Sequence, residues 1–234
     1  MSDESAIPRS VLAERVKDRL LQDILSGRYP PHSRIIETRV ARELGTSQAP
    51  VREALRGLEA LGVVEILPFR GARVRRPTAH ELLEAYAVRA ELEVLGARLG
   101  VPRMSDADLL ELEAIHDEMQ LAADAGDRHE VAVADARFHA RLLRLAANAT
   151  LERVWSSLEP FSRTYITLVA PGANEHWTAD LHPRIVAALQ TRDPEAVAAA
   201  LRRHFDEASA HLASGWQDAI EAPAPARRSG PRAR

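Results

Sequence analysis

The fold is decided by LGTSQAPVREAL, residues 44–55, and by GVVEILPFRGARV, residues 62–74. Gly45 lies where one helix must end and reverse, a position that favours a residue tolerant of positive φ. Ser47 is placed to N-cap the next helix, with Pro50 in its first turn, where a missing N–H costs little. The pattern indicates a helix-turn-helix followed by a small wing, which is a means of placing one helix in a groove of DNA.

The helix after this turn is predicted to have a buried stripe and a polar face. Apolar residues recur at helical spacing and predict the buried stripe: Val51, Ala54, Leu55 and Leu58. In recognition helices the residues off that stripe, near the N-terminal half, meet base edges, and here they are Gln48, Ala49, Arg52 and Arg56. Further apolar positions are suited to packing the two short helices together: Ile24, Ile35, Val40, Ala41 and Leu44.

Two β-prone runs, 63–67 and 72–75, are joined by Pro68-Phe69-Arg70-Gly71. This spacing predicts a tight hairpin with Arg70 at its tip. Arginines are often ordinary solvated residues, so these positions carry the DNA hypothesis only together with the helix-turn-helix that precedes them.

The net charge of −3 conceals an uneven distribution over the 234 residues. Residues 1–76 hold 14 Lys or Arg against 10 Asp or Glu, giving +4, and residues 77–234 hold 17 against 24, giving −7. A basic part on an acidic body orients a protein on a polyanion. We therefore expect a DNA-binding domain at 1–76, a helical domain at 77–220, and a disordered Pro-, Ala- and Arg-rich tail at 221–234.

The composition also excludes several classes of protein. The chain has no cysteine, so it has neither a disulfide framework nor a thiolate metal site. It has no apolar run approaching the ~18 residues of a membrane span, and no apolar core of a signal peptide near its first residues. We expect a soluble, cytoplasmic protein.

The second domain is expected to be helical almost throughout. Pro and Gly breaks, with apolar residues recurring at three and four, divide it into an antiparallel bundle of six helices near 78–100, 105–125, 128–147, 150–169, 174–191 and 193–217. No strand pattern is present in this half, so the predicted fold class is mainly α.

Polar residues interrupt the apolar faces of this bundle. Asp135 and His139 are four residues apart and project from the same side of one helix. His182 precedes an apolar stripe, and His204 lies within another. A divalent cation would satisfy all four groups, since imidazole and carboxylate suit Zn, Ni, Mn or Fe. From spacing alone, hydrogen-bonded core histidines explain the pattern equally well.

Residues 20–76 resemble the winged-helix domain of the GntR superfamily. The segments that carry the resemblance are ILSGRYPPHSRIIE (24–37), the LG-S-PVREAL core and the P-RGARV wing. The resemblance implies contacts with DNA at Thr38, Arg39, Ser47, Gln48, Ala49, Pro50, Arg52, Arg70 and Gly71. Position 48 is usually Arg in this family; Gln favours adenine where Arg favours guanine, so base preference at this position is open.

Residues 80–213 resemble the helical ligand-binding domain of the FadR group, known as the FCD domain. The carriers are AYAVRAELEVLGARL (85–99), DARFHARLLRLAAN (135–148) and HPRIVAALQTRDPEAVAAALRRHF (182–205). The resemblance implies a divalent metal on Asp135, His139, His182 and His204. Six helices favour the VanR-type subgroup over the fatty-acid regulator, which binds an acyl-CoA without this metal. Arg89 resembles an arginine that holds the charge of a bound acid, although it is equally placed to pair with Glu93.

These resemblances imply a homodimeric regulator, by default a repressor, whose affinity for a pseudo-palindromic operator in double-stranded DNA is set by a small organic acid bound at the metal. Two alternatives stay open. In the first, the helical domain would be a metal-dependent hydrolase or oxygenase. In the second, its metal would be purely structural.

Overall fold

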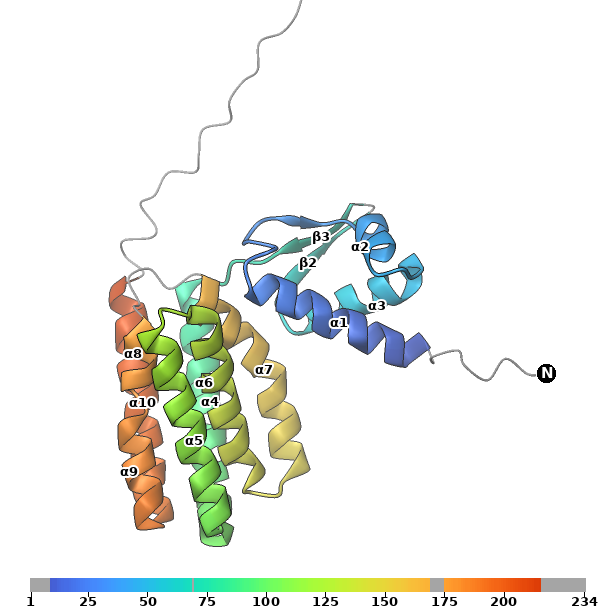
Figure 1. Ribbon diagram of the computed structural model, residues 1–234. Helices are drawn as coiled ribbons and strands as arrows, with labels where there is room; N and C mark the ends of the chain where they lie inside the picture. Colours follow the sequence, from blue (N-terminus) through green and yellow to red (C-terminus); the bar gives the residue numbers. More distant parts are fainter. Residues whose placement is uncertain (1–8, 69, 169–174, 216–234) are drawn as a thin grey trace, which may run out of the picture.

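The structure is a computed structural model that describes residues 9–68, 70–168 and 175–215 (Figure 1). The expected disordered tail at 221–234 lies outside the described residues, as does Phe69 of the hairpin tip. No helix in the described part is both long and apolar enough to cross a bilayer. The front part contains α1 (Arg9–Leu25), β1 (Arg34–Ile35), α2 (Glu37–Glu43), α3 (Gln48–Ala60), β2 (Val64–Leu67) and β3 (Gly71–Val74).

The helix-turn-helix forms where the sequence places it. Gly45 has a φ of +63° and separates α2 from α3, as its position predicts. Ser47 occupies the N-cap of α3 with an extended backbone, but its side chain makes no capping hydrogen bond. The predicted stripe of α3 is buried in the core that α1 and the sheet complete. Leu44 is the exception to the predicted packing, because it ends α2 and is 38% exposed.

The wing is an antiparallel hairpin in which Val64 pairs with Val74 and Leu67 with Gly71. A third strand, β1, joins the two expected ones and pairs with β3, giving the order β1-β3-β2. Gly71 is required here for two reasons. Its φ is +81°, and a Cβ at this position would lie 2.3 Å from the carbonyl oxygen of Ile35 in β1.

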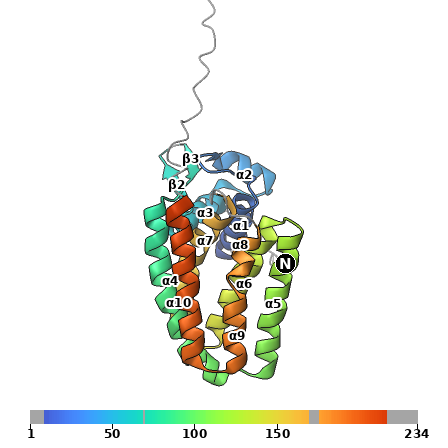
Figure 2. The same ribbon diagram turned by 90° about the vertical axis from the view of Figure 1, so that its left-hand side faces the viewer.

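The second part is an antiparallel helical bundle below the wing (Figure 1). Figure 2 shows α4 and α10 side by side along one face of it. Its elements are α4 (Ala79–Gly100), the 3₁₀ turn η1 (Val101–Arg103), α5 (Asp106–Asp124), α6 (Arg128–Arg144), α7 (Ala149–Leu168), α8 (Glu175–Asp180), α9 (Pro183–Thr191) and α10 (Pro194–Gly215).

The expected helix at 174–191 is divided into α8 and α9, so the expected six helices become seven in the described residues. Pro183 is the cause, because it lacks the N–H that a continuous helix needs and instead occupies the first position of α9. His182 therefore lies at a helix break and not within a helix stripe. The number of helices consequently does not distinguish the VanR-type subgroup from the rest of the FadR group.

The connection between the two parts is short and fixed at both sides. Strand β3 ends at Val74, and α4 begins after Thr78, whose side chain and that of Glu81 form a reciprocal capping box. Arg75 also donates to Glu81 over 2.5 Å, and α1 packs against α7. The start of α4 is thus attached directly to the end of the wing.

Candidate functional site

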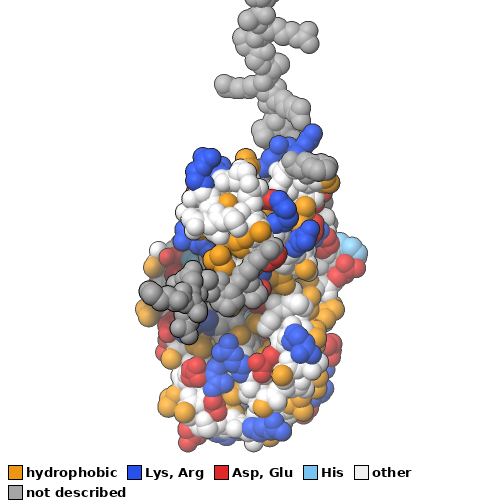
Figure 3. All heavy atoms as spheres, turned by 90° about the vertical axis from the view of Figure 1, so that its right-hand side faces the viewer, with side chains coloured by type: hydrophobic (Ala, Val, Ile, Leu, Met, Phe, Trp, Pro, Cys, Tyr) orange, Lys and Arg blue, Asp and Glu red, His pale blue; other side chains and the backbone are white. Residues whose placement is uncertain are grey.

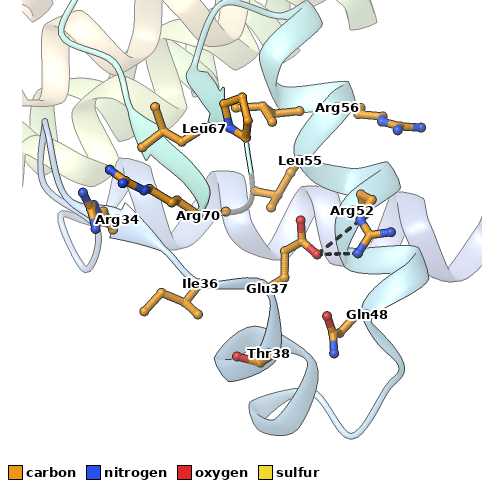
Figure 4. Close-up of a pocket in the computed structure, with 13 residues that line it drawn as sticks. Arg34, Ile36, Glu37, Thr38, Gln48, Arg52, Leu55, Arg56, Leu67 and Arg70 are labelled. Carbon is orange, nitrogen blue, oxygen red and sulfur yellow. Dashed lines mark hydrogen bonds and ion pairs between the residues drawn. The ribbon is translucent and has the colours of Figure 1, made fainter.

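The winged helix carries an open groove of about 750 Å³ between α2, α3 and the hairpin (Figure 4). We call it the wing groove. Four arginines line it together with several apolar side chains, and Figure 3 shows Lys and Arg side chains on this upper part of the surface. The lining residues are Arg34, Ile36, Glu37, Thr38, Gln48, Arg52, Leu55, Arg56, Ile66, Leu67, Pro68, Arg70 and Gly71.

The wing groove brings together five of the residues expected to contact DNA: Thr38, Gln48, Arg52, Arg70 and Gly71. Arg52 comes from α3 and Arg70 from the hairpin tip, and both are exposed on this common surface. Of the other expected residues, Ser47 is exposed beside the groove, Ala49 is half-buried, and Pro50 is buried in the first turn of α3. Arg39 lies over the ring of Tyr29, 5.7 Å from its centre.

Arg52 is already held by an acidic partner within the wing groove. Its Nε and Nη2 atoms donate to the same oxygen of Glu37, over 3.3 and 3.0 Å (Figure 4). The hydrogen bond that Arg52 donates to Glu37 and the charge of that carboxylate raise the pKa of Arg52, so the guanidinium keeps its proton. The sequence interpretation assigned no role to Glu37.

A second site lies inside the bundle, where the structure brings together the four residues expected to bind a metal. We call Asp135, His139, His182 and His204 the histidine cluster. The ligand atoms of the three histidines all lie within 4.8 Å of one another, and the three side chains are buried. The Asp135 Oδ1 atom is 3.4 Å from His182 Nε2 and 3.7 Å from His139 Nε2. These residues come from α6, α10 and the break before α9.

The hydrogen-bond partners fix which nitrogen of two imidazoles faces the centre. His139 Nδ1 donates to Glu93 over 2.5 Å, and His182 Nδ1 donates to the backbone carbonyl of Thr178 over 2.9 Å. Each Nε2 atom is therefore left with a lone pair, and the two Nε2 atoms are 3.3 Å apart. Three acceptors, these two nitrogens and the Asp135 oxygen, thus face one another.

Glu93 is the carboxylate that orients His139, and it is completely buried. Its Oε1 atom accepts from Arg89 Nη2 over 3.0 Å and from Trp155 Nε1 over 2.7 Å, while Oε2 accepts from His139. Burial alone would raise the pKa of Glu93, but its interactions with His139 and Arg89, and the hydrogen bonds from His139 and Trp155, outweigh burial and hold the pKa at about 2. A carboxylate that orients a metal-binding histidine in this way is common in metal sites.

Arg89 takes the pairing that the sequence left open. It is buried, bonds to Glu93, and also lines the small cavity beside the histidine cluster. Burial opposes its charge, yet Glu93 and Asp135 raise the pKa of Arg89. Its Nε atom is buried without a hydrogen-bond partner among the described residues. Pairing with Glu93 therefore leaves part of the guanidinium available to a further acceptor.

The remaining two imidazoles are held in the neutral form that a metal requires. Burial lowers the pKa of His182 to about 4 against the opposing charge of Asp135. Burial, together with the nearby His182 and His139, lowers the pKa of His204 well below its ordinary value. His204 Nδ1 is also buried with no hydrogen-bond partner in the described part of the chain. A buried nitrogen without a partner destabilises the fold unless a ligand binds to it.

The donor set fits a divalent cation. Ligand atoms held about 2.0–2.2 Å from one tetrahedral ion lie roughly 3.3–3.6 Å from one another, and the three acceptors of the cluster have separations of 3.3, 3.4 and 3.7 Å. The adjoining cavity, lined by Arg89, His204 and the aromatic rings of Tyr86, Trp177 and Phe205, has a volume of about 20 Å³. That space suits one water molecule or ion.

The sequence interpretation did not include Glu93, Trp155 or the Thr178 carbonyl in the site. The pattern of α4 offered one indication, because Arg89 and Glu93 continue the buried stripe that begins at Leu82 and Tyr86. Two charged residues on a buried stripe need partners inside the core. Nothing in the sequence indicated which carbonyl or indole would supply the others.

An arginine-lined groove between a helix-turn-helix and a wing, joined to a helical bundle with a buried polar cluster, defines the class of winged-helix DNA-binding regulators. Residues 12–74 match the family described as bacterial regulatory proteins, gntR family, and residues 84–207 match the FCD domain. The chain therefore belongs to the gntR family of bacterial transcriptional regulators and carries an FCD domain.

Similar proteins match this chain over most of its length. The chain is 34% identical over 219 residues to a probable D-xylose utilization operon transcriptional repressor of Paenarthrobacter nicotinovorans, covering 92% of this chain and 96% of that protein. It is 25% identical to the gluconate operon transcriptional repressor of Bacillus licheniformis, covering 91% and 90%. A crystal structure of a putative GntR regulator from Rhodococcus sp. RHA1 superimposes with a TM-score of 0.76 at 25% identity, covering 86% of this chain and 97% of that one.

Proposed function

We propose that this regulator binds a pseudo-palindromic operator as a homodimer, through residues 1–76, and that a small organic acid bound at a divalent metal in residues 77–220 controls its affinity for DNA. One observation carries the proposal. The buried polar and charged side chains of the described residues are Arg89, Glu93, Asp135, His139, Thr178, His182 and His204, and all of them belong to the histidine cluster or adjoin it. A fold that needed only stability would bury apolar residues there.

The balance of buried charges at the histidine cluster favours binding of a cation, and then of an anion beside that cation. The buried charged side chains are the Arg89 guanidinium and the carboxylates of Glu93 and Asp135, which leaves one excess negative charge. A divalent cation such as Zn, Ni, Mn or Fe changes this to one excess positive charge. A bound metal supplies an open coordination position for a carboxylate oxygen. Arg89, with its unpartnered Nε atom, is placed to donate a hydrogen bond to the same acid.

The names of two relatives agree with this class of effector, whereas the 34% identical relative is named for D-xylose, a neutral sugar. The gluconate operon repressors are named for a sugar acid, which is a small carboxylate. The cavity beside the histidine cluster, at about 20 Å³, holds no organic acid without enlarging. Binding of the acid would therefore require the surrounding side chains or helices to move, and a ligand that prefers the rearranged state shifts the population of the protein toward that state. Such couplings are typically worth about 1–3 kcal/mol.

The second copy of the chain is expected on the exposed side of α4. Val88, Leu92, Leu95 and Leu99 follow one another at spacings of four, three and four residues, and three of them are 38–50% exposed. This spacing is that of a helix–helix seam. Pairing two bundles through α4 would place two wing grooves on one duplex, which matches a two-fold symmetric operator.

The wing groove supplies the DNA contacts of the proposal. Arg52 and Gln48 lie at the end of α3 that meets base edges, with Arg70 on the wing beside them. Gln48 favours adenine at its position. Arg52→Ala is expected to weaken binding in a gel-shift titration while the bundle stays folded by circular dichroism. Unchanged affinity would contradict the placement of the recognition helix.

The metal is tested by elemental analysis of the purified protein. We expect about one divalent ion per chain in the wild type and none in the double variant His182→Ala, His204→Ala. His80→Ala is the control, because His80 is exposed on the first turn of α4, where it lies 3.3 Å from Glu84 and outside the histidine cluster. If the wild type contains no metal, the proposal fails. If the double variant keeps full occupancy, the metal is bound elsewhere and the proposed site is wrong.

The enzymatic alternative requires a general base at the metal, and the nearby Glu93 already accepts three hydrogen bonds. Incubating metal-loaded protein with a panel of small sugar acids distinguishes the two functions. Binding without turnover, accompanied by a change in DNA affinity, supports the sensor. Metal-dependent stability without any response to the acids supports a structural metal.

A further inference from the structure

The wing groove contains one acidic side chain among its basic ones. Of the described lining residues, Arg34, Arg52, Arg56 and Arg70 are basic and Glu37 is acidic. Glu37 points from the start of α2 across the groove to Arg52 on α3 (Figure 4). A carboxylate in this position repels the phosphates that the four arginines attract.

The pairing leaves one end of the Arg52 guanidinium for DNA. Glu37 uses only Nε and Nη2, and neither contact involves Nη1. Guanine is recognised when an arginine donates two parallel hydrogen bonds to O6 and N7. The end formed by Nη1 and the second hydrogen of Nη2 can make these bonds while the Nε side stays attached to Glu37.

Fold stability does not explain the pair. The Arg52 and Glu37 side chains are 53% and 21% exposed, and an ion pair in such surroundings contributes little to stability. Glu37 also lies in the first turn of α2, where a negative charge interacts favourably with the helix dipole. That effect requires a charge at this turn, but it does not require a contact with Arg52.

We propose that Glu37 is a positioning residue that holds Arg52 in the orientation for guanine and prevents it from binding phosphate. This inference rests on the proposed placement of α3 in the major groove and adds a determinant of specificity to it. Without Glu37, the arginine would be free to turn toward the backbone of any duplex. The protein would then bind DNA with less discrimination between sequences.

The test compares one selected duplex with a shuffled one. The wild type selects its preferred duplex from a randomised pool, and the affinities for this duplex and for a shuffled duplex of the same composition are measured at several salt concentrations. In Glu37→Gln we expect the ratio of the two affinities to fall about tenfold, in line with the loss of one bidentate base contact. We also expect the salt dependence to steepen by about one phosphate contact, a slope change of about −0.9.

Two further variants separate position from charge. Glu37→Asp keeps the charge but is one methylene too short for the same contact, so the ratio should fall while the affinity for the shuffled duplex stays low. Glu65→Gln is the matched control. It removes one charge from another exposed ion pair of the same domain, Arg73–Glu65 at 2.7 Å, outside the wing groove, and it should leave the ratio unchanged.

The outcomes decide the inference separately from the proposed function. If the wild type selects no sequence from the pool, the placement of α3 itself is wrong. If the wild type selects a sequence but Glu37→Gln matches Glu65→Gln in both ratio and salt slope, only the role of Glu37 is wrong. A fall in the ratio for Glu37→Gln and Glu37→Asp, with the control unchanged, supports it.

Discussion

Replacing Glu93 by Gln tests the bundle at its most heavily bonded side chain. The carboxylate is completely buried and accepts from Arg89, Trp155 and His139. An amide keeps the shape but removes the charge and turns one acceptor into a donor. Arg89, itself 3% exposed, then loses its ionic partner inside the core. Breaking a buried ion pair by removing one member typically costs about 3–5 kcal/mol.

This cost is large against a total stability of about 5–15 kcal/mol. For a chain of this length, each kcal/mol lowers the unfolding temperature by about 2–4 °C, so Glu93→Gln should melt roughly 6–20 °C below the wild type. The measurement is thermal and urea unfolding of chelator-treated protein, followed by the helical circular dichroism signal, so that metal does not contribute to the difference.

Glu91→Gln is the control on the same helix. Glu91 is 70% exposed and its contact with Arg202 is 3.7 Å long, so its loss should change stability by less than about 0.5 kcal/mol. Adding Arg89→Met to Glu93→Gln should recover part of the loss, because it removes the unpaired guanidinium. Equal stability of the Glu93 and Glu91 variants would refute the assignment of Glu93 as the central acceptor.

Three further predictions concern the wing and the connection to the bundle. Operator affinity should fall steeply between 50 and 200 mM salt, roughly in proportion to the number of phosphates contacted, and a flat titration would argue against direct DNA binding. Gly71→Ala should destabilise the wing by roughly 1–3 kcal/mol and weaken DNA binding, because the new Cβ meets the Ile35 carbonyl; Gly126→Ala, with a φ of +70° and nothing within 4 Å, is the control for strain alone. Glu81→Gln should lower the free energy of unfolding by about 0.5–1 kcal/mol at pH 7 through loss of the capping box. The hydrogen bond from the Thr78 backbone lowers the pKa of Glu81 in the folded state below the ordinary value of 4.5. Urea unfolding should therefore show a constant difference from the wild type above a pH of about 4.5, which disappears as the pH falls through the folded-state pKa.

Much of the front domain was predictable because its decisive positions depend on local backbone chemistry. Gly45 and Gly71 both adopt positive φ, and the alternation of the hairpin strands fixes which side chains face the core. A helix at 9–25 was not predicted from the sequence, although Val16, Leu20 and Ile24 of α1 recur at helical spacing and are buried. Strand β1 was not predictable in the same way, because two residues are too few to show an alternation.

In the bundle, the four residues of the histidine cluster were predictable, but their geometry was not. Their identity rests on a resemblance between sequences, whereas the orientation of each imidazole depends on partners distant in the chain. His139 is fixed by Glu93, 46 residues away, and Glu93 by Trp155, 62 residues away. Periodicity reports which face of a helix is buried, but it does not report which helix lies opposite.

Helix α4 unites the parts of the molecule that the proposed function needs to connect. Its middle carries Arg89 and Glu93 at the histidine cluster, and its first turn is tied through Glu81 to Thr78 and Arg75 at the end of the wing. Because the cavity beside the cluster has room for little more than a water molecule, the proposed organic acid would require the side chains or helices that line it to move. A shift of α4 would be passed to the wing over four residues, 75–78, whose ends are bonded on both sides. A shift of α10 or α8 would first have to be relayed through α4 or through α7, which packs against α1. Of these two helices, α4 carries residues that adjoin the histidine cluster and also continues directly into the wing, so under the proposed function it is the more direct connection.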